Sequence, residues 1–98
     1  MAAKTERTYS EPEIQNKLKA LPGWSLEGGW IRRAYKTDGW PTTLMLVNAI
    51  GYVAEAANHH PDLTVTWAQV IVKLQTHSAG GVTDKDFELA RHIEDAAL

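Results

Sequence analysis

Three of the four histidines in this 98-residue chain lie between positions 59 and 77, with carboxylates on either side of them. His59 and His60 are adjacent, His77 follows further along, and Glu55 and Asp86 flank the group. Imidazole titrates near neutral pH, and neighbouring carboxylates tune it, so paired histidines beside carboxylates suit general acid–base catalysis. We therefore interpret these residues as a candidate site of proton transfer.

A predicted helix leads into the first two histidines. It runs from Pro41 to about His59, and Pro61 disfavours helical angles at His60, so the helix ends there. Gly51 costs the helix about 1 kcal/mol relative to alanine, which predicts close packing by another backbone. The stripe of apolar residues that indicates the helix is Leu46, Ile50, Val53 and Ala57, widened by Leu44, Val47 and Ala54.

Two strands and a last helix follow. Leu63, Val65 and Trp67 alternate with threonines, which predicts a half-buried strand, and residues 70–77 alternate in the same way. His77 would end this second strand. Thr83-Asp-Lys-Asp86 has the pattern of a capping box for a helix through about residue 97. We expect helix end, strand end and helix start to converge at one edge of the molecule and form a cleft.

The N-terminal half predicts one more helix and a hairpin. Ser10, Pro12 and Glu13 are typical of a helix start, and this helix ends near residue 20. Residues 24–26 and 30–36 form the hairpin around Gly28-Gly29. The order αββαββα predicts an α+β two-layer sandwich, a four-stranded antiparallel sheet with three helices on one face. We expect residues 1–98 to form one domain.

Composition excludes several functional classes. Ten Lys and Arg against twelve Asp and Glu give a net charge of −2, and only Arg32 and Arg33 are adjacent among the basic residues. This argues against a nucleic-acid surface. The chain has no cysteine for a disulfide, thiolate site or nucleophile. It also shows no apolar leader and no membrane span, so we expect a soluble cytoplasmic protein.

Other interpretations of the same residues stay open. His59 could simply complement the charge at a helix C-terminus. We expect Asp86 to cap its helix in any case, and His92 to lie on the surface. The spacing alone leaves a metal site open. We expect none, because adjacent histidines would have to point apart and no i, i+4 histidine pair exists.

The segment Glu55-Ala-Ala-Asn-His59-His60-Pro61, together with Trp67, His77 and Asp86, resembles the signature of the pterin-4a-carbinolamine dehydratases. The stretch from Thr76 to Phe87 is similar to a second conserved stretch of that family, and Gly-Trp24-Ser-Leu-Glu is similar to a third. The resemblance covers nearly the whole chain. It departs at Leu63, where several relatives have an aromatic residue, and at Lys85, where some have arginine. Neither departure removes an acid–base group.

The resemblance implies the αββαββα fold and the loss of water from 4a-hydroxytetrahydropterin to give quinonoid dihydropterin. No metal or organic cofactor is implied. We interpret His60 and His77 as the acid–base pair and His59 as a residue that orients the substrate. In the implied site, His59, His60 and His77 line the pterin pocket, Pro61 shapes it, Glu55, Thr76 and Asp86 support it, and Trp24 is a candidate wall, or else a core aromatic residue.

The family also contains proteins recruited for binding, which is the alternative function. One relative is a dimerisation cofactor for a homeodomain transcription factor, and others are RuBisCO assembly factors with a disrupted cleft. The retained histidines favour the enzyme here. A hydroxylase, a transcription factor or RuBisCO is therefore the implied kind of protein partner. We also expect a homo-oligomer, dimer or tetramer, because the helix from Pro41 is apolar on more than one stripe and the sheet has edges to cover.

Overall fold

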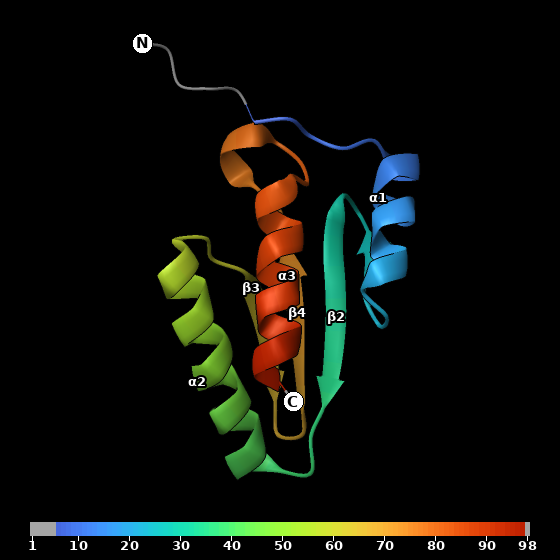
Figure 1. Cartoon of the computed structure of the whole chain (residues 1–98). Helices are drawn as coiled ribbons and strands as arrows, with labels where there is room; N and C mark the ends of the chain where they lie inside the picture. The colour runs from blue at the N-terminus through green and yellow to red at the C-terminus, as the bar shows by residue number, and fades with distance from the viewer. Residues whose placement is uncertain (1–5, 98) are drawn as a thin grey trace.

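The computed structural model describes residues 6–97 as a four-stranded sheet with helices packed against it (Figure 1). Two short 3₁₀ turns, η1 and η2, interrupt the sequence of helices and strands. The elements are α1 (Glu11–Lys17), η1 (Leu18–Ala20), β1 (Ser25–Glu27), β2 (Trp30–Lys36), α2 (Trp40–Ala57), β3 (Asp62–Thr66), β4 (Gln69–Leu74), η2 (His77–Ala79) and α3 (Asp84–Ala97).

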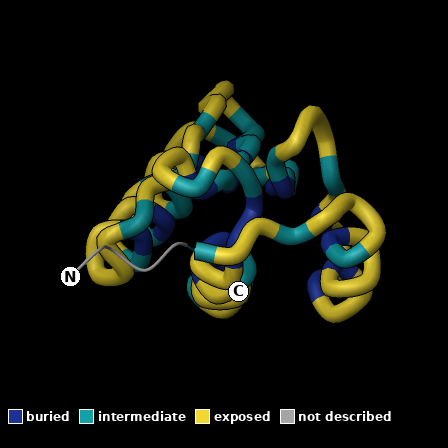
Figure 2. The backbone as a smooth tube through the Cα atoms, turned by 90° about the horizontal axis from the view of Figure 1, so that it is seen from above, coloured by how far each residue is buried: buried dark blue, intermediate teal, exposed yellow. Residues whose placement is uncertain are grey.

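The sheet is antiparallel throughout, with the strand order β1-β2-β4-β3. Alternate side chains of the two central strands, among them Ile31, Val72 and Leu74, are fully buried against the helices. Seen from above, the helices lie along one side of the sheet and leave the other side open (Figure 2). The predicted α+β sandwich is therefore confirmed.

Local signals explain where the helices begin and end. Ser10 and Glu13 form the expected capping box at the start of α1. The helix α2 ends at Asn58, whose φ of 51° is left-handed and turns the chain out of the helix. At the start of α3 the Asp86 carboxylate accepts a hydrogen bond from the Thr83 backbone at 2.9 Å, as a capping box requires.

Several details differ from the sequence prediction. The strand β4 ends at Leu74, so His77 opens the turn η2 instead of ending a strand. Trp67 lies in the turn between β3 and β4 and is 70% exposed, because β3 is an edge strand and is only slightly covered. A Cβ atom at Gly51 would meet no atom of the described residues within 4 Å, so the predicted close packing by another backbone is not found within residues 6–97.

The apolar stripe of α2 is only partly covered. Ile50 and Ala54 are buried, whereas Leu44 and Ala57, which the pattern placed near the core, are exposed. The helix therefore packs along a narrower stripe than its composition suggests. No helix within residues 6–97 is both long enough and apolar enough to span a membrane.

Candidate active site

A cavity of about 440 Å³ lies at the end of the sheet where α2 stops and α3 begins. Its wall is built from the start of β2, the turn after α2, the start of β3, the segment through η2, and the first turn of α3. The predicted convergence of separate elements at one edge is therefore present. The lining residues are Trp30, Asn58, His59, His60, Asp62, Gln75, Thr76, His77, Ser78 and Lys85.

His59 is held by a buried carboxylate. Its Nε2 lies 2.6 Å from Oδ1 of Asp86, and the two side chains are 12% and 0% exposed. A carboxylate that accepts hydrogen bonds requires the imidazole to donate, which places the proton on Nε2. In the neutral imidazole, the Nδ1 atom of His59 is then an acceptor. The pair thus fixes both the tautomer and the orientation of the ring.

Asp86 is itself fixed by two further donors. Its Oδ2 atom accepts from the Thr76 hydroxyl at 2.8 Å and from the Thr83 amide at 2.9 Å. Thr76 and Thr83 also contact each other through their hydroxyls at 2.7 Å, and all three residues are buried. A buried carboxylate must be satisfied in this way, because an unpaired one is costly. The network joins the end of β4 to the start of α3 behind the cavity.

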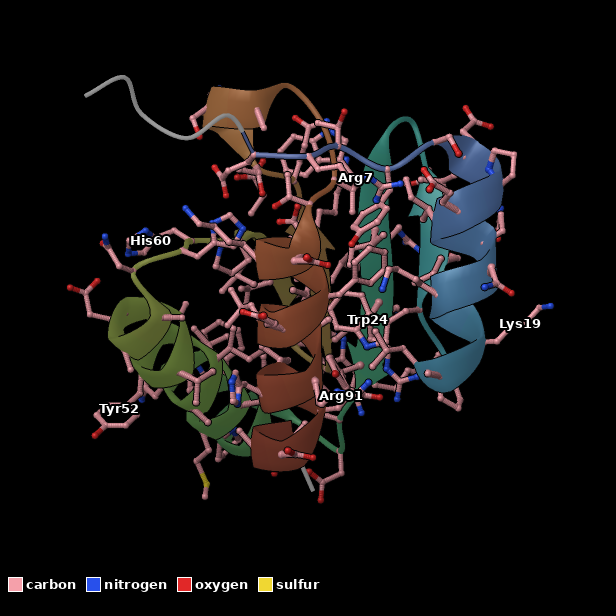
Figure 3. All side chains as sticks on the ribbon, turned by 45° about the horizontal axis from the view of Figure 1, so that its top comes forward. Arg7, Lys19, Trp24, Tyr52, His60 and Arg91 are labelled. Atoms are coloured by element: carbon pink, nitrogen blue, oxygen red, sulfur yellow. The ribbon has the colours of Figure 1, made fainter. Side chains whose placement is uncertain are left out.

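His60 forms a second pair with a carboxylate at the surface. Its Nε2 donates to Oε1 of Glu55 at 2.9 Å, and the side chains are 60% and 80% exposed. Figure 3 shows His60 projecting at the surface beyond the end of α2. Glu55 lies four residues before His59, so a continued helix would have placed Glu55 beside His59 instead. The left-handed turn at Asn58 explains the difference, because it directs His59 towards α3.

His77 reaches the cavity from a different element, the turn η2 that follows β4. It is exposed and begins η2, directly after the buried Thr76. A bridge between Thr76 and Gly81 closes this turn, with the Thr76 amide donating to the Gly81 carbonyl at 2.9 Å. His77 and His60 therefore lie around one cavity and not on opposite sides of the sheet.

One candidate for the site lies elsewhere. Trp24 is 6% exposed and belongs to the hydrophobic core, so it is not a wall of the cavity. Figure 3 shows it between α1 and α3, far from His60. Pro61, which was predicted to shape the pocket, is not itself a lining residue but lies between His60 and Asp62, which both line the cavity. The aromatic wall is Trp30, which the sequence interpretation did not assign.

Lys85 brings a cation to the rim. It lines the cavity, and its Nζ atom pairs with Glu6 at 3.2 Å, so the chain segment before α1 crosses close to the site. Lys85 and His59 also border a separate cavity of about 270 Å³ that includes His92. His92 thus lies outside the cavity that His59, His60 and His77 line, which we call the main cavity. Within residues 6–97, no three His, Cys, Asp or Glu side chains are grouped so that they could hold a metal ion.

Comparisons with known proteins identify the family. Residues 7–96 match the model of the pterin 4 alpha carbinolamine dehydratase family, and the chain belongs to that family. It is 45% identical over 89 residues to a protein of Aquifex aeolicus provisionally named pterin-4-alpha-carbinolamine dehydratase, covering 91% of this chain and 90% of that protein. A similarly named protein of Roseiflexus is 41% identical over 86 residues, covering 88% and 92%.

Two solved structures share the fold. The crystal structure of a transcriptional coactivator/pterin dehydratase from Brucella melitensis superposes with a TM-score of 0.87 at 32% identity, covering 94% of this chain and all of that one. A pterin dehydratase-like RuBisCO assembly factor of the alpha-carboxysome has a TM-score of 0.62 at 13% identity, covering 76% and 86%. This second likeness concerns the fold alone.

Proposed function

We propose that this protein dehydrates 4a-hydroxytetrahydropterin to quinonoid dihydropterin in the cytoplasm, and so recycles the pterin used by aromatic amino-acid hydroxylases. The observation that carries the proposal is the position of His59, His60 and His77 around one cavity. Membership of the dehydratase family supports it. The cavity also has the size of a small-molecule site.

The reaction needs two proton transfers. The C4a–O bond breaks as a proton reaches the leaving oxygen, which departs as water. The proton on N5 is removed, and its bonding electrons form the new C4a=N5 double bond. Two imidazoles of opposite protonation state can carry out both transfers, each contributing about 10²–10⁴-fold. We assign them to His60 and His77, whose exposed rings can exchange protons with solvent.

His59 suits a different role. Because its Nε2 is occupied by Asp86, only the Nδ1 acceptor remains for the substrate. We propose that this acceptor orients the 4a-hydroxyl or the pterin ring. In this scheme Glu55 supports His60, while Thr76 and Asp86 hold His59 in position.

A direct assay tests the proposal. Purified protein should accelerate dehydration of 4a-hydroxytetrahydropterin, and a chelator should leave the rate unchanged, because no step uses a metal. Folded wild-type protein that shows no acceleration over buffer would overturn the enzyme assignment. The alternative, a dehydratase-like binding protein with a protein partner, would then lead.

We also propose that the exposed side of α2 is covered by a second copy of the chain. Met45 and Tyr52 are 71% and 78% exposed, and the position of Gly51 beside them is open. The unpaired edge of β3 is a further surface to cover. Light scattering should give the mass of a dimer or tetramer at micromolar concentration, and Tyr52→Glu should reduce it. A monomer mass for the wild type would contradict this proposal.

A further inference from the structure

Trp30 differs from every other residue around the main cavity. It is the single large hydrophobic side chain among the described residues of the lining, which otherwise carry hydroxyl, amide, imidazole, carboxylate or ammonium groups. It is only partly buried, so its ring is not fully used by the core. A flat apolar surface in a polar cavity calls for a flat partner.

The strand pattern places Trp30 on the open face of the sheet. Its neighbour Ile31 is fully buried against the helices, and successive side chains of a strand point to opposite faces. Lys73 on β4 also points away from the core, between the buried Val72 and Leu74. The wall of the cavity therefore continues from the histidine edge onto the uncovered face of the sheet.

One contact to the indole and one to the backbone before it position Trp30. The Nζ atom of Lys73 lies 5.2 Å from the centroid of the Trp30 ring, over its face. In the turn before Trp30, the Gly29 carbonyl accepts from Nε2 of Gln75 at 3.0 Å, which ties that turn to the residue after β4. Gln75 itself lines the cavity. The ring is thus positioned before any ligand arrives.

We propose that Trp30 is the stacking platform for the planar pterin ring. This inference rests on the proposed function and adds a binding residue to it. Stacking holds the bicyclic ring by its face, which leaves its reacting C4a–N5 edge free for His59, His60 and His77. Aromatic stacking contributes most when the opposing ring is flat and partly polar at its edges, as a heterocycle is. Trp30 acts through binding and takes no part in proton transfer.

The proposal predicts a change in affinity with little change in turnover. Trp30→Ala should raise KM, and the Kd for 7,8-dihydropterin, by about 10-fold. The kcat should stay within about two-fold, because stacking binds ground state and transition state alike. Trp30→Phe keeps a flat ring and should lose only about three-fold. Trp67→Phe, at the far end of the sheet, is the matched control and should leave KM, kcat and Kd unchanged.

Fluorescence gives a second measurement that does not need an active enzyme. Binding of 7,8-dihydropterin should quench the tryptophan emission of the wild type and of Trp67→Phe, and Trp30→Phe should lose most of that quenching. A folded Trp30→Ala protein with wild-type Kd would overturn the proposal, as would full quenching in Trp30→Phe. If dehydration is absent but binding still depends on Trp30, the proposed function fails while this inference stands. If the wild type does not bind 7,8-dihydropterin, the inference fails.

Discussion

The two histidine–carboxylate pairs of the cavity involve neighbouring histidines and yet have opposite surroundings. His59 and Asp86 form a pair that is almost fully buried, with Thr76 and Thr83 completing the bonds of the carboxylate. His60 and Glu55 form a pair in which both side chains are mostly in solvent. The left-handed turn at residue 58 lets the adjacent His59 and His60 point to different environments.

In the proposed mechanism, this difference corresponds to a division between orienting the substrate and transferring protons. A buried pair is rigid and expensive to break, so it suits a residue that must hold one tautomer. An exposed pair is weak and screened by water, so its histidine stays accessible to solvent and to a ligand. If the comparison is right, changes at the buried pair should affect folding and activity together, whereas changes at the exposed pair should affect activity alone.

The largest effect is expected at the buried carboxylate. Asp86→Ala should lower the free energy of unfolding by about 4 kcal/mol, because it leaves His59, the Thr76 hydroxyl and the Thr83 amide without their shared acceptor. It should also abolish dehydration. Urea denaturation and the dehydratase assay measure the two effects.

A matched variant separates helix capping from histidine orientation. Thr83→Ala removes the hydroxyl that accepts from the Lys85 amide at 3.3 Å and contacts the Thr76 hydroxyl at 2.7 Å, but leaves the bond between His59 and Asp86. We expect it to cost about 1 kcal/mol of stability and to retain most activity. Equal losses of activity in the two variants would mean that Asp86 acts only as a cap.

The next effect is kinetic and concerns the exposed rings. His60→Ala and His77→Ala should each slow turnover by about 10²–10⁴-fold, because each removes one proton-transfer partner. Their free energies of unfolding should change by less than about 0.5 kcal/mol, because both residues are exposed. His92→Ala, outside the main cavity, should be nearly silent. Activity that survives both changes would remove these catalytic roles.

A partly buried pair away from the cavity tests whether burial by itself matters for activity. The Tyr35 hydroxyl donates to Glu94 near the C-terminal end of α3. Tyr35→Phe should cost about 1 kcal/mol of stability and leave kcat unchanged. A fall in kcat comparable to that of the histidine variants would mean that losing such a pair lowers activity even away from the cavity. The position of the pair formed by His59 and Asp86 would then not explain its effect.

The same tyrosine gives a pH dependence with a definite sign. Burial, and then the bond to Glu94, raise the pKa of Tyr35 above its ordinary value, so the folded state keeps the phenol protonated. The stability that this contributes is present below about pH 10 and is lost as the pH rises beyond the unfolded pKa. Tyr35→Phe should therefore show a shallower alkaline loss of stability than the wild type in urea denaturation, and equal slopes would contradict this.

The sequence predicted the elements well because their signals are local. Apolar periodicity and capping residues are read within a few positions, and they gave α3 and the hairpin with nearly the observed bounds. The partners of side chains depend on tertiary geometry. The capping pattern identified Asp86 as a cap but could not reveal that its other oxygen holds His59. The alternation of buried and exposed residues in β2 predicts that Trp30 points away from the core. Only the pairing of β2 with β4 shows that Trp30 lies at the end of the sheet near the histidines.

The smallest effect is expected at Glu55, and it is the sharpest test of the comparison. Glu55→Gln keeps an oxygen that can accept from His60 and removes only the charge. Because both side chains are mostly exposed, the charge contributes little in water, and salt screens what remains. Turnover should fall by less than about three-fold. The difference should shrink further in about 0.5 M salt, because salt shortens the distance over which exposed charges interact. A loss as large as that of His60→Ala would instead show that His60 needs a fixed carboxylate as His59 does, and the two pairs would then share one function despite their different burial.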